Sequence, residues 1–226
     1  MTRTTDRFEV AVAAGPTASG AVADWELYFA RRALAKLKAR LGHEAMVELL
    51  AEDIEAGNRA VGGWAAASEG RWRPAETRLR ISGLSAGEFM TYFHSIFDDR
   101  PAMLAAQPEH FAMGLVDGVM EVLENLGPNI ARFYIRFTEE DRAVGELLPD
   151  HPVRMVGNVA LPDGTVLAHL LHQLRDTETG FDAVLGIYFP EATPEEVIEG
   201  HRRHLAVEFT NWITGAARSL GRVSTP

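Results

Sequence analysis

Residues 193–220, TPEEVIEGHRRHLAVEFTNWITGAARSL, predict one long amphipathic helix. Thr193 is a favoured N-cap residue, and Pro194 suits the first helical position after it. Acidic residues in the first turns lie at the positive end of the helix dipole, and Arg218 lies near the negative end. Gly221 predicts the end of the helix.

The predicted helix has an apolar face and a polar stripe along its border. The apolar face consists of Ile198, Leu205, Phe209, Trp212, Ala216 and Leu220. The polar stripe consists of His201, His204, Glu208, Asn211 and Gly215. Because His204 and Glu208 are four residues apart, their side chains are neighbours on the helix. They are either two metal ligands or a solvated surface pair, and the spacing leaves both interpretations open.

Composition limits the classes of function. The chain has 226 residues, 46% of them hydrophobic, which suits one large domain or a domain with an N-terminal extension. A net charge of -10 with dispersed basic residues argues against nucleic-acid and membrane partners. There is no cysteine, so any metal must be held by His, Asp or Glu. Without a signal-like or membrane-spanning apolar run, we expect a soluble cytoplasmic protein.

The order of the remaining patterns predicts an α+β protein. We expect residues 1–70 to form an arm and a helical hairpin, and residues 71–226 to form the main domain. Before the main domain we expect a short strand at 8–13 and helices at 24–41 and 43–61, the second ended by Gly62-Gly63. In the main domain we expect strands at 74–82, 118–126, 130–137, 153–161, 166–175 and 181–189, and short helices after Ser85 and at 101–106.

A curved antiparallel sheet that grips the long helix would satisfy this order of elements. Such a sheet leaves a cavity between its concave face and the helix, which is a common place for a small-molecule site. The helical hairpin is expected to pack on this domain or to form a homodimer contact.

Two glutamates, Glu121 and Glu124, interrupt the apolar strand expected at residues 118–126. A buried, unpaired carboxylate is strongly destabilising, so each must reach solvent or a partner. The two are three residues apart and therefore point to opposite faces of the strand. The face of Glu124 is the more apolar, so a cation shared with His204 and Glu208 would supply the partner that Glu124 needs.

The other histidines form no metal motif by spacing alone. We expect His43 at a solvated helix start, His151 in a surface loop and His110 in a loop just before the sheet. His169 and His172 are three apart on one strand, so at most one of them faces a cavity.

Four segments of the chain resemble the 2,4-diacetylphloroglucinol hydrolase family, which includes phloretin hydrolases. They are GLSAGEFMTYFH at 83–94, PEHF at 108–111, HLLHQLRDT at 169–177 and HLAVE at 204–208. Their order matches the family, and the resemblance covers residues 78–220. The chain departs from the family at FDAVLG, residues 181–186, which lacks the acidic and arginine residues found there, and in having no tryptophan around His94.

The resemblance implies a helix-grip fold of the START/Bet v type and a zinc ion, or another divalent metal, held by two histidines and two glutamates. The matching positions here are His110, Glu124, His204 and Glu208, with Glu121 as the alternative strand ligand.

The implied reaction is hydrolysis of a carbon–carbon bond between an acyl group and a phenolic or polyketide-derived aromatic ring. The substrate would be a small aromatic ketone. The implied catalytic residues are Glu208 and a proton donor to the ring carbon, for which His94 and His172 are the first candidates and His169 is another.

Two other functions remain open at this stage. One is a metal-free binding protein or an aromatase/cyclase-type enzyme that uses the same cavity for a polyketide-like ligand. The other is a non-catalytic partner subunit that associates through the N-terminal hairpin.

Overall fold

The computed structural model describes residues 21–222, so the strand predicted at residues 8–13 lies outside the described residues. The helices are α1 (Val22–Leu49), α2 (Ala51–Ser68), α3 (Ala86–Ser95), α4 (Arg100–Ala105) and α5 (Glu195–Ser219), with one 3-10 turn, η1 (Glu140–Arg142). The strands are β1 (Trp72–Ser82), β2 (His110–Val116), β3 (Val119–Leu126), β4 (Asn129–Phe137), β5 (Val153–Ala160), β6 (Val166–Asp176) and β7 (Gly180–Pro190).

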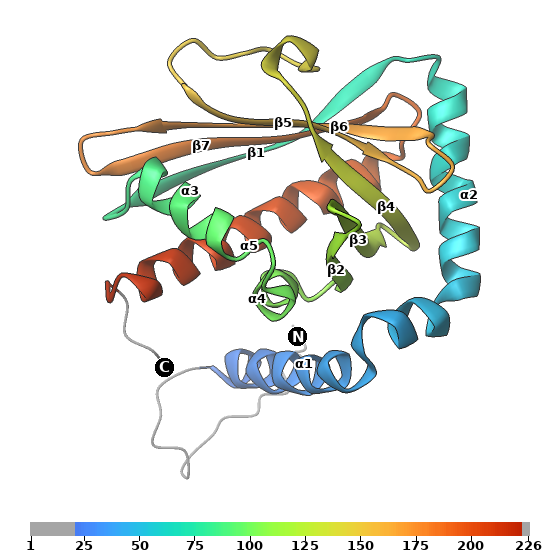
Figure 1. Cartoon of the computed structure of the whole chain (residues 1–226), viewed down its shortest axis with the longest axis horizontal. Helices are drawn as coiled ribbons and strands as arrows, with labels where there is room; N and C mark the ends of the chain where they lie inside the picture. Colours follow the sequence, from blue (N-terminus) through green and yellow to red (C-terminus); the bar gives the residue numbers. More distant parts are fainter. Residues whose placement is uncertain (1–20, 223–226) are drawn as a thin grey trace, which may run out of the picture.

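The strands form one open antiparallel sheet in the order β1-β7-β6-β5-β4-β3-β2. β1 is an edge strand, which explains why Pro74 is tolerated within it. In Figure 1, β1, β7, β6 and β5 run across the top while β4, β3 and β2 turn downwards, so the sheet curves around α5. The predicted α+β class is confirmed, and the arrangement is consistent with a helix-grip-like architecture.

The sequence patterns, which are alternation, apolar runs and turn residues, predict every strand except β2. His110 is the first residue of β2, so its predicted place in a loop is wrong. The pairing of β2 with β3 shifts register between His110 and Ala112, and Gly114 interrupts the apolar side chains. Neither strict alternation nor a long apolar run therefore marks this strand.

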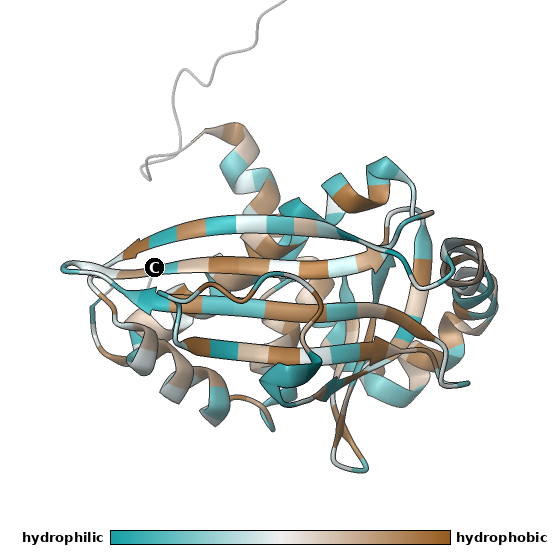
Figure 2. Ribbon diagram, turned by 90° about the horizontal axis from the view of Figure 1, so that it is seen from above, coloured by the Kyte–Doolittle hydropathy of each residue, from teal (hydrophilic) through white to brown (hydrophobic). Residues whose placement is uncertain are grey.

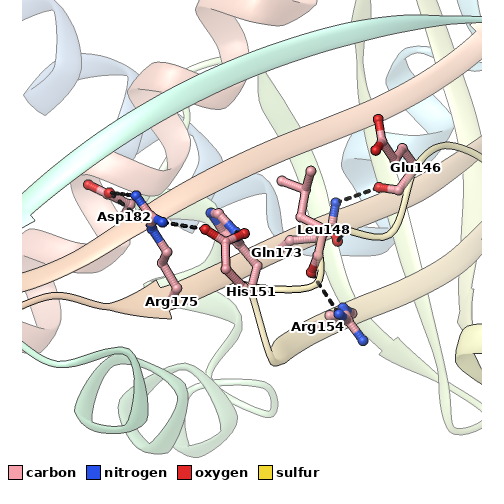
Figure 3. A network of polar contacts seen from close by, with 8 residues as sticks. Glu146, Leu148, His151, Arg154, Gln173, Arg175 and Asp182 are labelled. Atoms are coloured by element: carbon pink, nitrogen blue, oxygen red, sulfur yellow. Dashed lines mark hydrogen bonds and ion pairs between the residues drawn. The ribbon is translucent and has the colours of Figure 1, made fainter.

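The outer face of the sheet is covered in part by the connection between β4 and β5. Figure 2 shows hydrophilic and hydrophobic residues mixed along the strands seen from this side. Gln173 on β6 accepts a hydrogen bond from the Leu148 amide at 2.8 Å and donates one to the Glu146 carbonyl at 3.0 Å (Figure 3). Arg175 on the same strand pairs with Asp150 of the connection and, at 3.0 Å, with Asp182 of β7. These contacts fasten the connection and leave the concave face to α5.

α5 is the predicted long helix, and its predicted apolar face is buried except for Leu220, which is exposed just beyond the helix end. Its predicted N-cap is wrong, because the helix begins one residue later, with Pro194 at the N-cap position. Thr193 belongs to the preceding turn, where its amide donates to the Pro190 carbonyl at 3.0 Å, and its hydroxyl has no partner. The predicted end is confirmed, since Gly221 has a φ of 68° and the Arg222 amide donates to the Ala217 carbonyl.

The N-terminal helices do not form the predicted hairpin. Gly42, with a φ of 74°, kinks α1 as expected, but α2 runs through Gly62 and Gly63 and ends at Glu69, which has a φ of 51°. The helix survives the two glycines because residues such as Val61 are buried by tertiary packing. Figure 1 shows α1 below the sheet and α2 upright beside it, and α1 packs on β2 while α2 packs on β4.

Candidate metal centre

Two strands and the long helix bring four side chains together under the concave face of the sheet. His110 at the start of β2 lies opposite Glu124 of β3 in the strand register. α5 contributes His204 and Glu208, which lie one turn apart. All four side chains are buried. The alternative interpretation of His204 and Glu208 as a solvated surface pair is therefore wrong.

The donor atoms of these residues converge. The Nε2 atom of His110 lies 3.2 Å from Nε2 of His204 and 3.3 Å from a carboxylate oxygen of both Glu124 and Glu208. Nε2 of His204 lies 3.4 Å from the same oxygen of Glu124. His110, His204 and Glu208 form one group that could hold a metal ion.

These separations suit a single ion bound by nitrogen and oxygen. In a tetrahedral zinc site with bonds of about 2.0–2.2 Å, neighbouring ligand atoms are about 3.3–3.6 Å apart. The four separations given above, 3.2–3.4 Å, lie within or close to this range of distances between ligand atoms. These four separations, and the chemistry of two imidazoles and two carboxylates, therefore fit a divalent metal.

His201 adds a fifth possible ligand. Glu124, His201 and His204 form a second group whose donor atoms lie within 4.8 Å of one another. The imidazoles of His201 and His204 stack with centroids 5.0 Å apart. The sequence signal for His201 is its place one turn before His204 on the polar stripe of the helix, but nothing in the family resemblance selects it.

Burial opposes ionisation throughout this cluster. Burial raises the pKa of Glu124, and it raises the pKa of Glu208 well above the usual value, with the charge of Glu124 acting in the same direction. Burial lowers the pKa of His110 to about 3 and also lowers the pKa of His204. The imidazoles are therefore neutral at pH 7, as metal ligands must be.

The two histidines differ in the hydrogen-bond partners of the ring nitrogen that faces away from the cluster. Nδ1 of His110 lies 3.5 Å from the Met103 carbonyl, which favours a proton on Nδ1 and a free lone pair on Nε2. Nδ1 of His204 is buried and has no hydrogen-bond partner. The carbonyl of His204 accepts a hydrogen bond from Gln107 at 3.3 Å.

A cavity of about 80 Å³ lies beside the cluster, between the sheet and α5. It is lined by His110, Glu124, His204 and Glu208 together with His172, His201 and mostly apolar or aromatic residues, including Phe93, Phe209 and Trp212. Nε1 of Trp212 is buried without a partner. The cavity thus has a polar end at the candidate ligands and an aromatic wall.

The predicted proton donors lie in three different places. His172 lines the cavity, and its Nδ1 accepts a hydrogen bond from the Gly186 amide at 3.2 Å. His169 points to the other face of β6, where its ring meets Trp72 edge-on at 4.4 Å. His94 is exposed on α3 and is not among the residues that line the cavity. The structure brings His172 to the candidate ligands and does not bring His94 or His169 there.

Burial lowers the pKa of His172 to about 3. A backbone amide can only donate, so Nδ1 of His172 is unprotonated and Nε2 carries the hydrogen. His172 is therefore a neutral hydrogen-bond donor at pH 7, rather than the charged acid expected of a proton donor.

Glu121 faces away from the cluster but is not solvated, because α1 and α2 cover that side of β3. Its carboxylate accepts hydrogen bonds from Arg132 at 2.8 and 3.2 Å and lies 3.3 Å from Nε2 of His43. The expectation that His43 is solvated is wrong, because its ring lies against the buried carboxylate of Glu121. His151, also expected at the surface, is buried beside Asp150, with 2.8 Å between Nδ1 and the carboxylate.

No family model matches this chain, and no curated protein matches it. Among residues 21–222, no helix combines the length and apolar character that a membrane crossing requires.

Proposed function

We propose that this protein is a metal-dependent hydrolase of helix-grip fold, with Zn²⁺ as its ion. In this proposal it cleaves the carbon–carbon bond between an acyl group and a phenolic or polyketide-derived aromatic ring. The observation that carries the proposal is that Nε2 of His110 lies 3.2–3.3 Å from donor atoms of Glu124, His204 and Glu208, at one end of an aromatic cavity. The resemblance of the chain to the 2,4-diacetylphloroglucinol hydrolase family supports the reaction class.

The donor set favours zinc over the hard cations. Calcium and magnesium prefer sites made of oxygen atoms, whereas imidazole suits zinc and its neighbours in the transition series. When bound, a zinc ion polarises a carbonyl group and lowers the pKa of a bound water.

The reaction consumes one water molecule and balances without a further reactant. Water adds to the acyl carbonyl carbon, the bond from that carbon to the ring breaks, and the ring carbon takes up a proton. The products are a carboxylic acid and the deacylated phenol.

The residues of the chain have three roles in this proposal. The second carboxylate oxygen of Glu208 takes the proton of the attacking water and returns it to the ring carbon as the bond to the acyl carbon breaks. The Nε2–H of His172 donates a hydrogen bond to an oxygen of the substrate. Phe93, Phe209 and Trp212 pack against the aromatic ring, and the unpartnered Nε1–H of Trp212 is available to a second oxygen. A cavity of about 80 Å³ must widen to admit an acylated phenol, and Met103 and Met155 in its wall are adaptable side chains.

The mostly apolar lining of the cavity favours a second candidate, a metal-free carrier or an aromatase/cyclase-type enzyme for a polyketide-like ligand. The two candidates differ in whether the chemistry at the cavity requires an ion.

The test measures metal content and release of carboxylic acid from acylated phloroglucinols in the wild type, Glu208→Gln and Glu199→Gln. Glu199 is a matched control, because it lies on the same helix, is only partly buried and pairs with Arg202 and Arg203. We expect bound zinc and acid release in the wild type and in Glu199→Gln, and neither in Glu208→Gln. Acid release that persists after complete removal of metal would contradict the proposal. A metal-free protein that binds the phenol without cleaving it would favour the carrier.

A further inference from the structure

Lys38 is a buried lysine on the far side of the sheet from the cavity. Only Lys38 and Met46 are buried among the residues of α1, although the helix carries many apolar side chains. Lysine is rarely buried unless its ammonium group is paired, so its place here calls for a specific partner. Burial lowers the pKa of Lys38 to about 8, which leaves most of the side chain charged at pH 7, with three N–H donors.

The partners of Lys38 are two backbone carbonyls at the start of β2. Its Nζ atom donates to the Pro108 carbonyl at 2.7 Å and to the His110 carbonyl at 2.5 Å. The two carbonyls bracket the backbone of His110. The β2–β3 register shifts directly after His110, so a side chain supplies donors where the strand ladder is irregular.

His110 is thereby held from both sides. Lys38 fixes its backbone from the outer face of the sheet, and the Met103 carbonyl lies 3.5 Å from its Nδ1 on the inner face. The remaining ring nitrogen, Nε2, is the atom that reaches Glu124, Glu208 and His204. A small movement of the strand start would shift Nε2 relative to the three other donors.

We propose that Lys38 is a positioning residue for the metal centre and that it acts through the backbone of His110. This inference rests on the metal site of the proposed function. It makes α1 part of the support of the centre rather than a separate extension. Residues that orient metal ligands typically change metal affinity about 10- to 100-fold when they are substituted.

The first experiment compares Lys38→Met with Met46→Ala. Met46 is buried on the same helix and packs against Ala112 and Leu123, so its truncation weakens the packing of α1 without touching the two carbonyls. Zinc affinity is measured by competition with a chromophoric chelator, and the visible spectrum of the Co²⁺-substituted protein reports ligand geometry. We expect Lys38→Met to bind zinc about 10- to 100-fold more weakly and to change the Co²⁺ spectrum, and Met46→Ala to do neither. Equal losses in both variants would overturn the proposal, because they would report weakened packing alone.

A double-mutant cycle removes the remaining ambiguity. If Lys38 acts through His110, Lys38→Met must have no further effect on zinc affinity in a His110→Ala background. An additive loss would overturn the proposal. If Lys38→Met does not fold, Lys38→Gln, which retains N–H donors, takes its place in both experiments, with a smaller loss expected.

The outcomes separate this inference from the function on which it rests. Wild-type protein that binds no zinc refutes the metal centre and Lys38 together. If the wild type binds zinc and Lys38→Met binds it as tightly, with the same Co²⁺ spectrum, the role of Lys38 is refuted and the metal centre remains in place.

Discussion

At the scale of single residues, the concave face carries two carboxylates that destabilise the metal-free protein. Glu124 and Glu208 are both buried, and the charge of Glu124 adds to the energetic penalty for ionising Glu208. The neutral imidazoles beside them do not supply a compensating positive charge. A divalent ion would, so the same residues that oppose folding without metal favour metal binding.

Glu208→Gln should therefore stabilise the metal-free protein. In the presence of a chelator at pH 8, we expect the free energy of unfolding to rise by about 1–4 kcal/mol, because a buried carboxyl group with no cationic partner has been replaced by a neutral amide. Added zinc should reverse the ranking of variant and wild type. Urea denaturation with and without zinc measures both effects, and a destabilised metal-free variant would contradict this account of Glu208.

A second residue-scale prediction contrasts the two histidines of β6. His172→Ala should abolish hydrolysis of acylated phloroglucinols while retaining zinc, since His172 lines the cavity but is not a proposed ligand. His169→Ala, on the opposite face of the same strand, should keep both activity and zinc. Equal activity in the two variants would remove His172 from the mechanism.

At the scale of elements, local periodicity predicts α5 and Glu124 well and β2 poorly. The spacing of His204 and Glu208 puts both on one border of α5, and strand parity puts Glu124 on the inner face of β3. The irregular start of β2 has no such pattern, so the place of His110 follows from tertiary pairing with Glu124 and not from its own neighbours. The prediction that His94 acts at the cavity fails for a different reason. Its aromatic neighbours in sequence do not determine which face of α3 meets the core, and His94 lies on the exposed face.

A prediction at this scale concerns the contact of α2 with β4. A Cβ atom at Gly57 would lie 1.9 Å from the Ile130 carbonyl oxygen, whereas one at Gly63 would meet nothing within 4 Å. Gly57→Ala should lower the free energy of unfolding by about 1–3 kcal/mol. Gly63→Ala should raise it by about 0.5–1 kcal/mol through helix propensity. Chemical denaturation of both variants checks the pair, and a neutral Gly57→Ala would show that α2 does not approach the sheet this closely.

At the scale of the whole molecule, the first strand pairs with the last and the N-terminal helices cover the far edge of the sheet. Sequence patterns supply the elements but not this order, because strand pairing depends on contacts between residues far apart in the chain. The cover provided by α1 and α2 also decides the environment of Glu121, whose partners Arg132 and His43 come from different elements.

Removal of residues 1–62 should therefore yield an insoluble or unfolded chain rather than a folded core. The truncation takes away Met46 and Ile54, which bury Leu123 and Ala112 of the sheet. Expression of residues 63–226, followed by solubility and circular dichroism measurements, checks this outcome. A soluble fragment with cooperative unfolding would instead support a separable extension, as the partner-subunit interpretation requires.

The stability of the metal-free protein should pass through a maximum near pH 6.5. The pKa values of His110 and His172 are lowered to about 3 from 6.5, so their folded forms release protons that the unfolded chain keeps, and stability rises with pH up to about 6.5. The pKa values of Glu124 and Glu208 are raised above 4.5, so stability falls as pH rises above that value. His201 and His204 also have lowered pKa values, so four buried histidines contribute the rise below pH 6.5. Above pH 6.5 the two glutamates contribute a fall, until a rise begins as pH passes the lowered pKa of Lys38, about 8. Thermal unfolding across pH 4 to 8 in a chelator measures this profile, and a steady rise between pH 6.5 and 8 would contradict it.

The most direct test of the metal centre is anomalous scattering at the zinc absorption edge from crystals grown with zinc. We predict one peak about 2.0–2.2 Å from Nε2 of His110, Nε2 of His204 and one carboxylate oxygen each of Glu124 and Glu208. Crystals without an anomalous peak at this point, or with zinc bound only at surface residues, would contradict the account.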